Sequence, residues 1–299
     1  MFGSFDSKYP IVCLSMNGIS GIDFPIAICK SGVFPSIFAA NYIRDGYGWV
    51  ERVKKDLHSF SKQLGHTNII FAVPDDNFVS SNKIAILDIV LNCGVSHIEI
   101  LSFRHNNTES LKIINALRSK GVKIIYKGMM FPNDISYDNF DAVILKCNEG
   151  AGRISQSDNT IIDLVQSCRS QYPHIDIIAS GGITTKQDVI DVLAAGATCA
   201  GIGTLFAFSE ESPIARTTKE RAIDNKTIKW IVSGSSVQNA VVFDEPNNES
   251  DANNSNGLLS SINGNGGHIF AGYAIKQIKS IESIETIVRR LAPAQGIEP

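Results

Sequence analysis

Two glycine turns follow one another in the second half of the sequence, and both could bind a phosphate group. Gly181-Gly182 follows one apolar run, and Gly201-Ile202-Gly203-Thr204 follows the next. A turn that ends a strand and opens a helix directs backbone N–H groups outward, and the helix dipole adds positive potential there. Two such turns, one strand–helix unit apart, are typical of the phosphate site formed by the last two loops of a (β/α)8 barrel. The pattern therefore predicts a phosphorylated ligand.

A second group of reactive side chains directly follows another apolar run. It contains Lys146, Cys147, Glu149 and Arg153. If the run is a barrel strand, Lys146 ends it and points into the mouth of the barrel, where barrel enzymes place their chemistry. Cys147 is a candidate nucleophile without an activating histidine nearby. Glu149 is a candidate base, or an ion-pair partner for Lys146 or Arg153. Lys127, after the preceding run, is a second cation for the same opening.

Cysteine and histidine are not spaced for a metal site. The six cysteines are scattered singly without a Cys-x-x-Cys pair, so zinc and a disulfide framework are not expected. The six histidines show no ligand spacing either. His105, after the fourth apolar run, and His268, after a polar segment, are the candidates for an acid–base group.

Short apolar runs alternate with amphipathic segments along most of the chain, which is typical of a parallel α/β sheet. The predicted strands are residues 11–14, 36–40, 68–73, 97–101, 123–126, 142–146, 176–179 and 198–201. The predicted helices between them include residues 49–64, 84–93, 110–119, 160–170 and 185–195. An open doubly wound sheet is the competing arrangement. Eight repeats and the paired glycine turns favour a closed (β/α)8 TIM barrel.

The last third of the chain differs in composition. Residues 244–267 are rich in Asn, Ser and Gly, and we expect a flexible loop insertion within a single domain of residues 1–299. A surface insertion is the favoured interpretation, and an active-site lid is the alternative. Residues 275–291 are apolar at helical spacing and predict a C-terminal helix that packs on the barrel.

Composition limits the classes of partner. The 299-residue chain is 43% hydrophobic with a formal net charge of -3, which supports a full core and argues against a nucleic-acid surface. Apolar segments stay shorter than about 18 residues, so no membrane span is expected. The start of the sequence lacks a signal-peptide pattern, and the single cysteines fit a reducing cytoplasm.

The order of motifs resembles a known family. The segments ASGGI, AAGA, GIGTLF and SEES, between residues 179 and 212, look like the C-terminal half of nitronate monooxygenases (2-nitropropane dioxygenases). Related flavin-dependent enoyl reductases share this pattern. Weaker similarity covers most of the chain, including residues 10–16, 31–36 and 272–288. The resemblance implies an FMN-binding TIM barrel.

The same resemblance implies positions for the cofactor. Its phosphate would contact Gly182, Gly201, Ile202, Gly203 and Thr204. Met16 would lie beside the flavin ring and Lys146 would touch the flavin, while Gly181 and Ala151 complete the cofactor-binding set. A cation near the N1–C2 carbonyl edge stabilises the anionic reduced flavin, which is the role expected of Lys146.

The chain departs from the family where the reaction occurs. The family motif Gln-Gly-x-Glu-Ala-Gly-Gly-His corresponds here to KCNEGAGR, so Lys146 replaces the glutamine and Arg153 replaces the catalytic histidine. Arginine stays protonated and cannot act as a general base, but it can hold an anion. A second departure is Pro74, which stands where the family has an asparagine that contacts FMN.

These observations predict an FMN-dependent oxidoreductase of altered chemistry. Lys146 would tune the flavin, Arg153 would orient a small, possibly anionic organic substrate, and Glu149 completes the catalytic set; the acceptor could be oxygen. One alternative is a non-catalytic or partner-dependent flavin-binding or phosphate-binding subunit. Another is a flavin-free phosphate-binding lyase or synthase. A homodimer or a partner enzyme stays open, and neither nucleic acid nor a membrane is expected as a partner.

Overall fold

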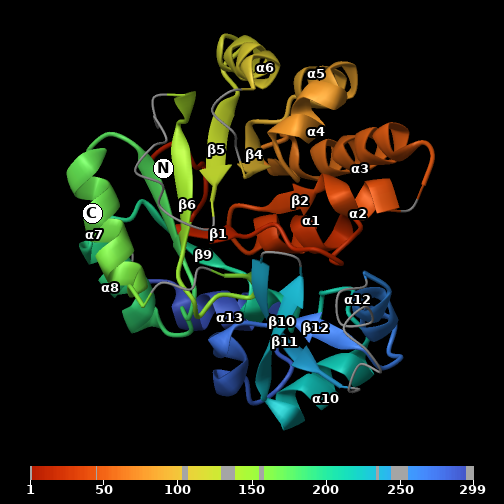
Figure 1. Cartoon of the computed structure of the whole chain (residues 1–299), viewed down its shortest axis with the longest axis vertical. Coiled ribbons are helices and arrows are strands. Elements are labelled where there is room, and N and C mark those ends of the chain that lie inside the picture. Colours follow the sequence, from red (N-terminus) through yellow and green to blue (C-terminus); the bar gives the residue numbers. More distant parts are fainter. Residues whose placement is uncertain are drawn as a thin grey trace.

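Eight short apolar strands form one sheet in which every neighbouring pair is parallel (Figure 1). The computed structural model describes residues 2–44, 46–102, 107–128, 139–154, 158–233, 236–243 and 255–293. The strand order is β1-β9-β8-β6-β5-β4-β3-β2. The strands are β1 (Ile11–Cys13), β2 (Ser36–Phe38), β3 (Ile70–Val73), β4 (His97–Leu101), β5 (Lys123–Lys127), β6 (Ala142–Lys146), β8 (Asp176–Ser180) and β9 (Cys199–Ile202).

The two ends of this sheet meet and close it into a barrel. Phe34, just before β2, forms a parallel bridge with Val12 of β1. The N–H of Cys13 donates to the carbonyl of Phe34 at 2.8 Å, and the N–H of Phe34 donates to the carbonyl of Ile11 at 3.0 Å. The prediction of a (β/α)8 TIM barrel is therefore confirmed, and the open doubly wound alternative is wrong.

Inside the barrel, side chains from most strands fill a core of their own. This inner core comprises Phe5, Val12, Phe34, Ile70, Ile125, Ala142, Ile144, Ile178 and Cys199. A larger core lies between the strands and the surrounding helices. The apolar runs are continuous in sequence because both faces of each strand are buried.

Helices connect the strands and cover the outside of the barrel. They are α1 (Asp23–Lys30), α2 (Ala39–Arg44), α3 (Trp49–Leu64), α4 (Asp76–Ser81), α5 (Lys83–Asn92), α6 (Thr108–Arg118), α7 (Ile161–Gln171), α8 (Lys186–Ala194), α9 (Thr204–Ala207) and α10 (Arg216–Asn225). Local signals set several starts. Thr160 and Thr185 form capping boxes with Asp163 and Asp188, which satisfy N–H groups at the starts of α7 and α8.

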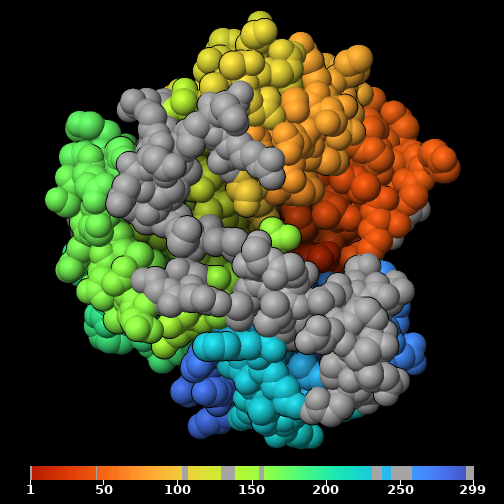
Figure 2. All heavy atoms as spheres, viewed as in Figure 1, coloured from red at the N-terminus to blue at the C-terminus, as the bar shows by residue number. Residues whose placement is uncertain are grey.

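A second, antiparallel sheet was not predicted from the sequence. It consists of β10 (Ile228–Ser233), β11 (Ser236–Val242), β12 (His268–Phe270) and the two-residue β7 (Gly152–Arg153). Figure 1 shows β10–β12 beside α10 and α12 (Ser255–Ile262), and Figure 2 shows these C-terminal residues gathered on one side of the barrel. The small sheet shares the large core through Val241 and Ile269. It is therefore packed onto the barrel rather than held on a linker.

Two C-terminal segments differ from their expected form. In the polar segment 244–267, residues 255–262 form α12, and residues 244–254 lie outside the described residues. The helix predicted over 275–291 is divided into the 3-10 helix η2 (Tyr273–Gln277) and α13 (Ile284–Leu291). The division occurs because Ile278 is extended, Ser283 caps α13, and the carboxylate of Glu211 accepts the N–H of Ile284 at 2.9 Å.

Three further features concern classes of site. None of the helices in the described ranges combines the length and apolarity needed to cross a bilayer. The described residues contain no group of three or more His, Cys, Asp or Glu side chains placed to hold a metal ion. All six cysteines are unpaired.

Candidate active site

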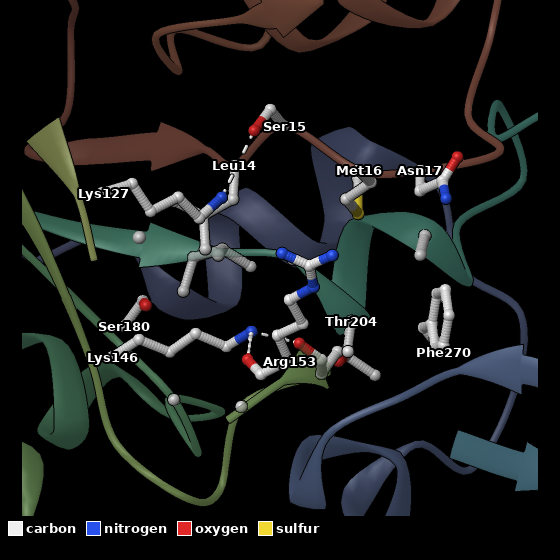
Figure 3. Close-up of a pocket in the computed structure, with 18 of the residues that line it drawn as sticks. Leu14, Ser15, Met16, Asn17, Lys127, Lys146, Arg153, Ser180, Thr204 and Phe270 are labelled. Carbon is white, nitrogen blue, oxygen red and sulfur yellow. Dashed lines mark hydrogen bonds between the residues drawn. The ribbon is translucent and has the colours of Figure 1, made fainter. Parts of the chain in front are cut away.

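A cavity of about 360 Å³ lies at the carboxyl ends of the barrel strands. The residues predicted to bind the cofactor or to form the catalytic set line it, namely Met16, Lys146, Glu149, Ala151, Arg153, Gly181, Gly182, Gly201, Ile202, Gly203 and Thr204. Gln238, Ile269 and Phe270 of the second sheet complete the wall. Figure 3 shows side chains from both sheets converging on this space.

The two glycine turns form one side of the cavity. Gly181 and Gly182 have φ angles of +115° and +71°, a left-handed conformation that favours glycine. A Cβ on Gly203 would meet nothing closer than the sulfur of Met16 at 3.8 Å, so the backbone there faces open space. The hydroxyl of Thr204 accepts the N–H of Gly272 at 3.0 Å and keeps its own proton for another acceptor.

The loop after β6 is held from the C-terminal part of the chain. The amide of Asn239, which is fully buried, donates to the carbonyls of Asn148 and Gly150 at 2.8 Å each. The N–H of Tyr273 donates to the carbonyl of Glu149 at 2.9 Å. These bonds fix the loop that leads to Arg153, and nothing in the sequence near residue 150 indicates them.

Arg153 lies in a strand rather than in a free loop. It pairs with Gln238 of β11, one residue after Gly152 pairs with Asn239. Figure 3 shows its guanidinium directed into the cavity towards Leu14 and Met16. Because β11 holds the backbone of Arg153 in place, the guanidinium extends from a fixed position and can reach a bound anion.

Lys146 ends β6 and reaches the same space from the barrel side. Its Nζ donates to the carbonyl of Arg153 at 2.7 Å and also to the carbonyl of Ala151 (Figure 3). Burial, and then the neighbouring positive charge of Lys127, lower the pKa of Lys146 to about 7. The amine therefore loses its proton more readily than an ordinary lysine.

A buried ion pair lies beneath the cavity, and the sequence analysis missed its carboxylate. Lys127 Nζ is 3.1 Å from Oε1 of Glu99, a fully buried residue of β4. The hydroxyl of Ser15 donates to the same Oε1 at 2.7 Å and accepts from Lys127 at 3.2 Å. The sequence signal for this pair is Glu99 itself, which stands in the centre of the apolar run 97–101. A buried carboxylate is costly unless it is paired.

The remaining candidates occupy other positions. The carboxylate of Glu149 lies against Gly182, and among the described residues it forms no ion pair with Lys146 or Arg153. Cys147 is buried, and its burial raises the pKa of the thiol, which disfavours a nucleophilic thiolate. His268 is buried in β12 and is not among the lining residues, and His105 lies outside the described residues.

Comparison with known proteins identifies the family. The sequence model of the nitronate monooxygenases matches residues 109–294, which is more than half of the chain. The chain belongs to the nitronate monooxygenase family. As a member of that family, it carries Arg153 and Lys146 within the matched region.

Solved structures support the fold of this nitronate monooxygenase family member. FabK from Thermotoga maritima is 18% identical, with a TM-score of 0.73 over 96% of this chain and 93% of that one. Nitroalkane oxidase from Streptomyces ansochromogenes is 17% identical, with a TM-score of 0.73 over 95% of each chain. At these identities the likeness concerns the fold alone.

A curated relative shares part of the sequence. Inosine-5'-monophosphate dehydrogenase from Borreliella burgdorferi is 29% identical over 134 residues, which is 40% of this chain. The chain spans about a third of that relative's length, since the match covers 33% of it.

Proposed function

We propose that this protein is an FMN-dependent oxidoreductase that acts on a small anionic organic substrate, with oxygen as a candidate acceptor. The observation that carries the proposal is that one cavity gathers both glycine turns and three basic side chains, Lys127, Lys146 and Arg153. Membership of the nitronate monooxygenase family supports it.

The residues present fit FMN. The cavity lies within the range of about 300–1,000 Å³ that is typical of small-molecule sites. The open backbone at Gly203 and the free donor of Thr204 suit a phosphate. Glu149 is the negative group at this end, and its exposed side chain can turn away from Gly182.

Each part of the site then has a role. Bound FMN would supply reversible electron transfer, while Gly181, Gly182 and residues 201–204 would hold its phosphate. Lys127 is held at the cavity by its ion pair with Glu99. Arg153 orients the anionic group of the substrate, since its guanidinium stays charged and forks towards two oxygens.

The visible spectrum of the purified protein tests the proposal. A yellow protein that releases FMN, is bleached by dithionite or NAD(P)H and is reoxidised is the expected result. A colourless protein that takes up no added FMN would contradict the proposal and favour a phosphate-binding barrel without flavin. A yellow protein that cannot be reduced and reoxidised would instead favour a non-catalytic subunit.

Gly203→Asp tests the phosphate position. The site has room for a side chain, but the added carboxylate would repel a phosphate. We expect FMN affinity to fall about tenfold or more, the effect of losing a charge-assisted contact, while riboflavin affinity stays within about twofold because riboflavin has no phosphate. Equal losses for both ligands would place the phosphate elsewhere.

A further inference from the structure

The amine of Lys146 is held in a way that suits its neutral form. Its two acceptors, the carbonyls of Ala151 and Arg153, match the two N–H groups of a neutral amine. An ammonium group has three N–H donors. A neutral Lys146 that donates to these two carbonyls keeps its lone pair for a proton from the cavity, which the residue lines.

The charges around Lys146 favour loss of its proton. Lys127 approaches from the neighbouring strand β5, and Figure 3 shows both lysines extending into the cavity from the same side. The carboxylate of Glu99 is bonded to Lys127 and Ser15 rather than to Lys146. Within the described ranges, no carboxylate forms an ion pair with Lys146. Glu149 lies against Gly182, and Cys147 is the first residue after β6. The third cation, Arg153, contacts Lys146 only through its backbone carbonyl, which accepts a hydrogen bond from the amine.

We infer that Lys146 is the proton-transfer residue of this cavity, taking the place of the family's absent histidine. The lone pair of the neutral amine forms an N–H bond as the X–H bond of the substrate breaks, and the bonding electrons stay on the substrate. The resulting ammonium returns the proton to product or solvent. Arg153 then binds the anion that forms.

The titration of Lys146 can be measured without any cofactor. Protein labelled with ¹³C-lysine is followed by NMR from pH 5 to 10, and the Cε signal of Lys146 is the one missing from K146R. We expect it to titrate near pH 7, because burial and the positive charge of Lys127 lower the pKa of Lys146. The exposed Lys120, assigned with K120R, is the matched control for the labelling and the assignment. A Lys146 signal that shows no titration below pH 9 would overturn the inference.

Removal of the neighbouring cation gives a second readout. In Lys127→Met, the repulsion that favours neutral Lys146 is gone, so the midpoint of the Lys146 titration should move upward by at least half a pH unit. An unchanged or lower midpoint would show that Lys127 does not set the proton equilibrium.

The role of Lys146 in catalysis rests on the proposed function. It is tested with two substrates that differ by one proton. Nitroethane needs a base before it can react, whereas its preformed anion, ethylnitronate, does not. With FMN bound, K146R should lower nitroethane oxidation at least about 100-fold, and this loss should exceed its loss of ethylnitronate oxidation, both measured as oxygen uptake. If K146R retained nitroethane oxidation as fully as ethylnitronate oxidation, the proton-transfer role of Lys146 would be overturned. Failure of wild-type protein to bind FMN would instead contradict the proposed function, and the NMR titration would still decide the inference.

Discussion

At the scale of single residues, the site depends on how charges are paired. Glu99 is fully buried and neutralises Lys127, so Lys146 has no carboxylate of its own among the described residues. Burying two cations with one anion leaves the second cation easy to deprotonate. The same arrangement has a consequence for stability.

Lys146→Met should change how stability depends on pH. Because the native pKa of Lys146, about 7, lies below its unfolded value of 10.5, the unfolded chain binds more protons between these pH values. The free energy of unfolding should therefore rise with pH in this window, by at most about 1.4 kcal/mol per pH unit for one group. Urea unfolding between pH 6.5 and 9.5 should show a steeper rise for wild type than for the variant. Parallel curves would contradict the prediction.

At the scale of elements, the second sheet positions the reactive end of the barrel. β11 pairs with β7 and carries Asn239, which bonds the loop after β6. Arg153 and Glu149 are thus placed by β11, in which Gln238, the residue paired with Arg153, lies 85 residues later in the sequence.

Asn239→Ala should destabilise the protein by roughly 2–4 kcal/mol, because two carbonyls lose their buried donors. The matched control is Asn92→Ala on the surface of α5, where only a bond to Asp88 is lost and the change should stay within about 0.5 kcal/mol. Chemical denaturation of both variants measures the difference. If the two variants behaved alike, Asn239 would not hold the loop.

The start of α8 is a second element that orients the site. Thr185 caps it directly after the Gly181-Gly182 turn, while Thr160 caps α7 with the same motif and is not among the lining residues. Either threonine changed to alanine should cost about 1 kcal/mol of stability. Only Thr185→Ala should also weaken FMN binding, by about threefold or more on titration. If Thr160→Ala weakened FMN binding equally, the cap of α8 would have no specific effect on FMN affinity.

The elements also show what sequence patterns can and cannot predict. The barrel strands are visible because burial on both faces produces continuous apolar runs, such as residues 142–146. β7 is only two residues long and exists because β11 pairs with it, so no local pattern marks it. The sequence therefore contains no signal for a strand at Arg153. The roles of the residues at the cavity stay predictions, since shape and charge alone do not identify a substrate.

At the scale of the whole molecule, the barrel and the C-terminal segments meet with almost no space between their backbones. A Cβ on Gly272 would lie 2.5 Å from the carbonyl oxygen of Glu149 and 2.8 Å from the carbonyl carbon of Gly150. The close approach lets the N–H of Gly272 donate to the hydroxyl of Thr204, which lines the cavity. One glycine thus joins the loop after β6, the loop after β9 and the C-terminal segment.

Gly272→Ala should force these segments apart and lower the stability by about 1–3 kcal/mol. Gly203→Ala is the matched control, since its Cβ would make only ordinary contacts at 3.8 Å or more and its φ of -117° suits alanine. That control should be neutral or slightly stabilising. Thermal unfolding of the two proteins without added FMN tests the pair. A Tm for Gly272→Ala at or above that of Gly203→Ala would show that the contact is not tight in solution.

The contacts of Asn239 and Gly272 also set an order of events on the ribosome. The loop that carries Arg153 is synthesised about 120 residues before Gly272. At translation rates of about 5–20 residues per second, several seconds separate the two. During this interval the barrel strands can already pair, but the carbonyls of Asn148, Glu149 and Gly150 have not met their donors. The nascent chain therefore gains its scaffold before its reactive end, which forms only when the C-terminal segment has emerged.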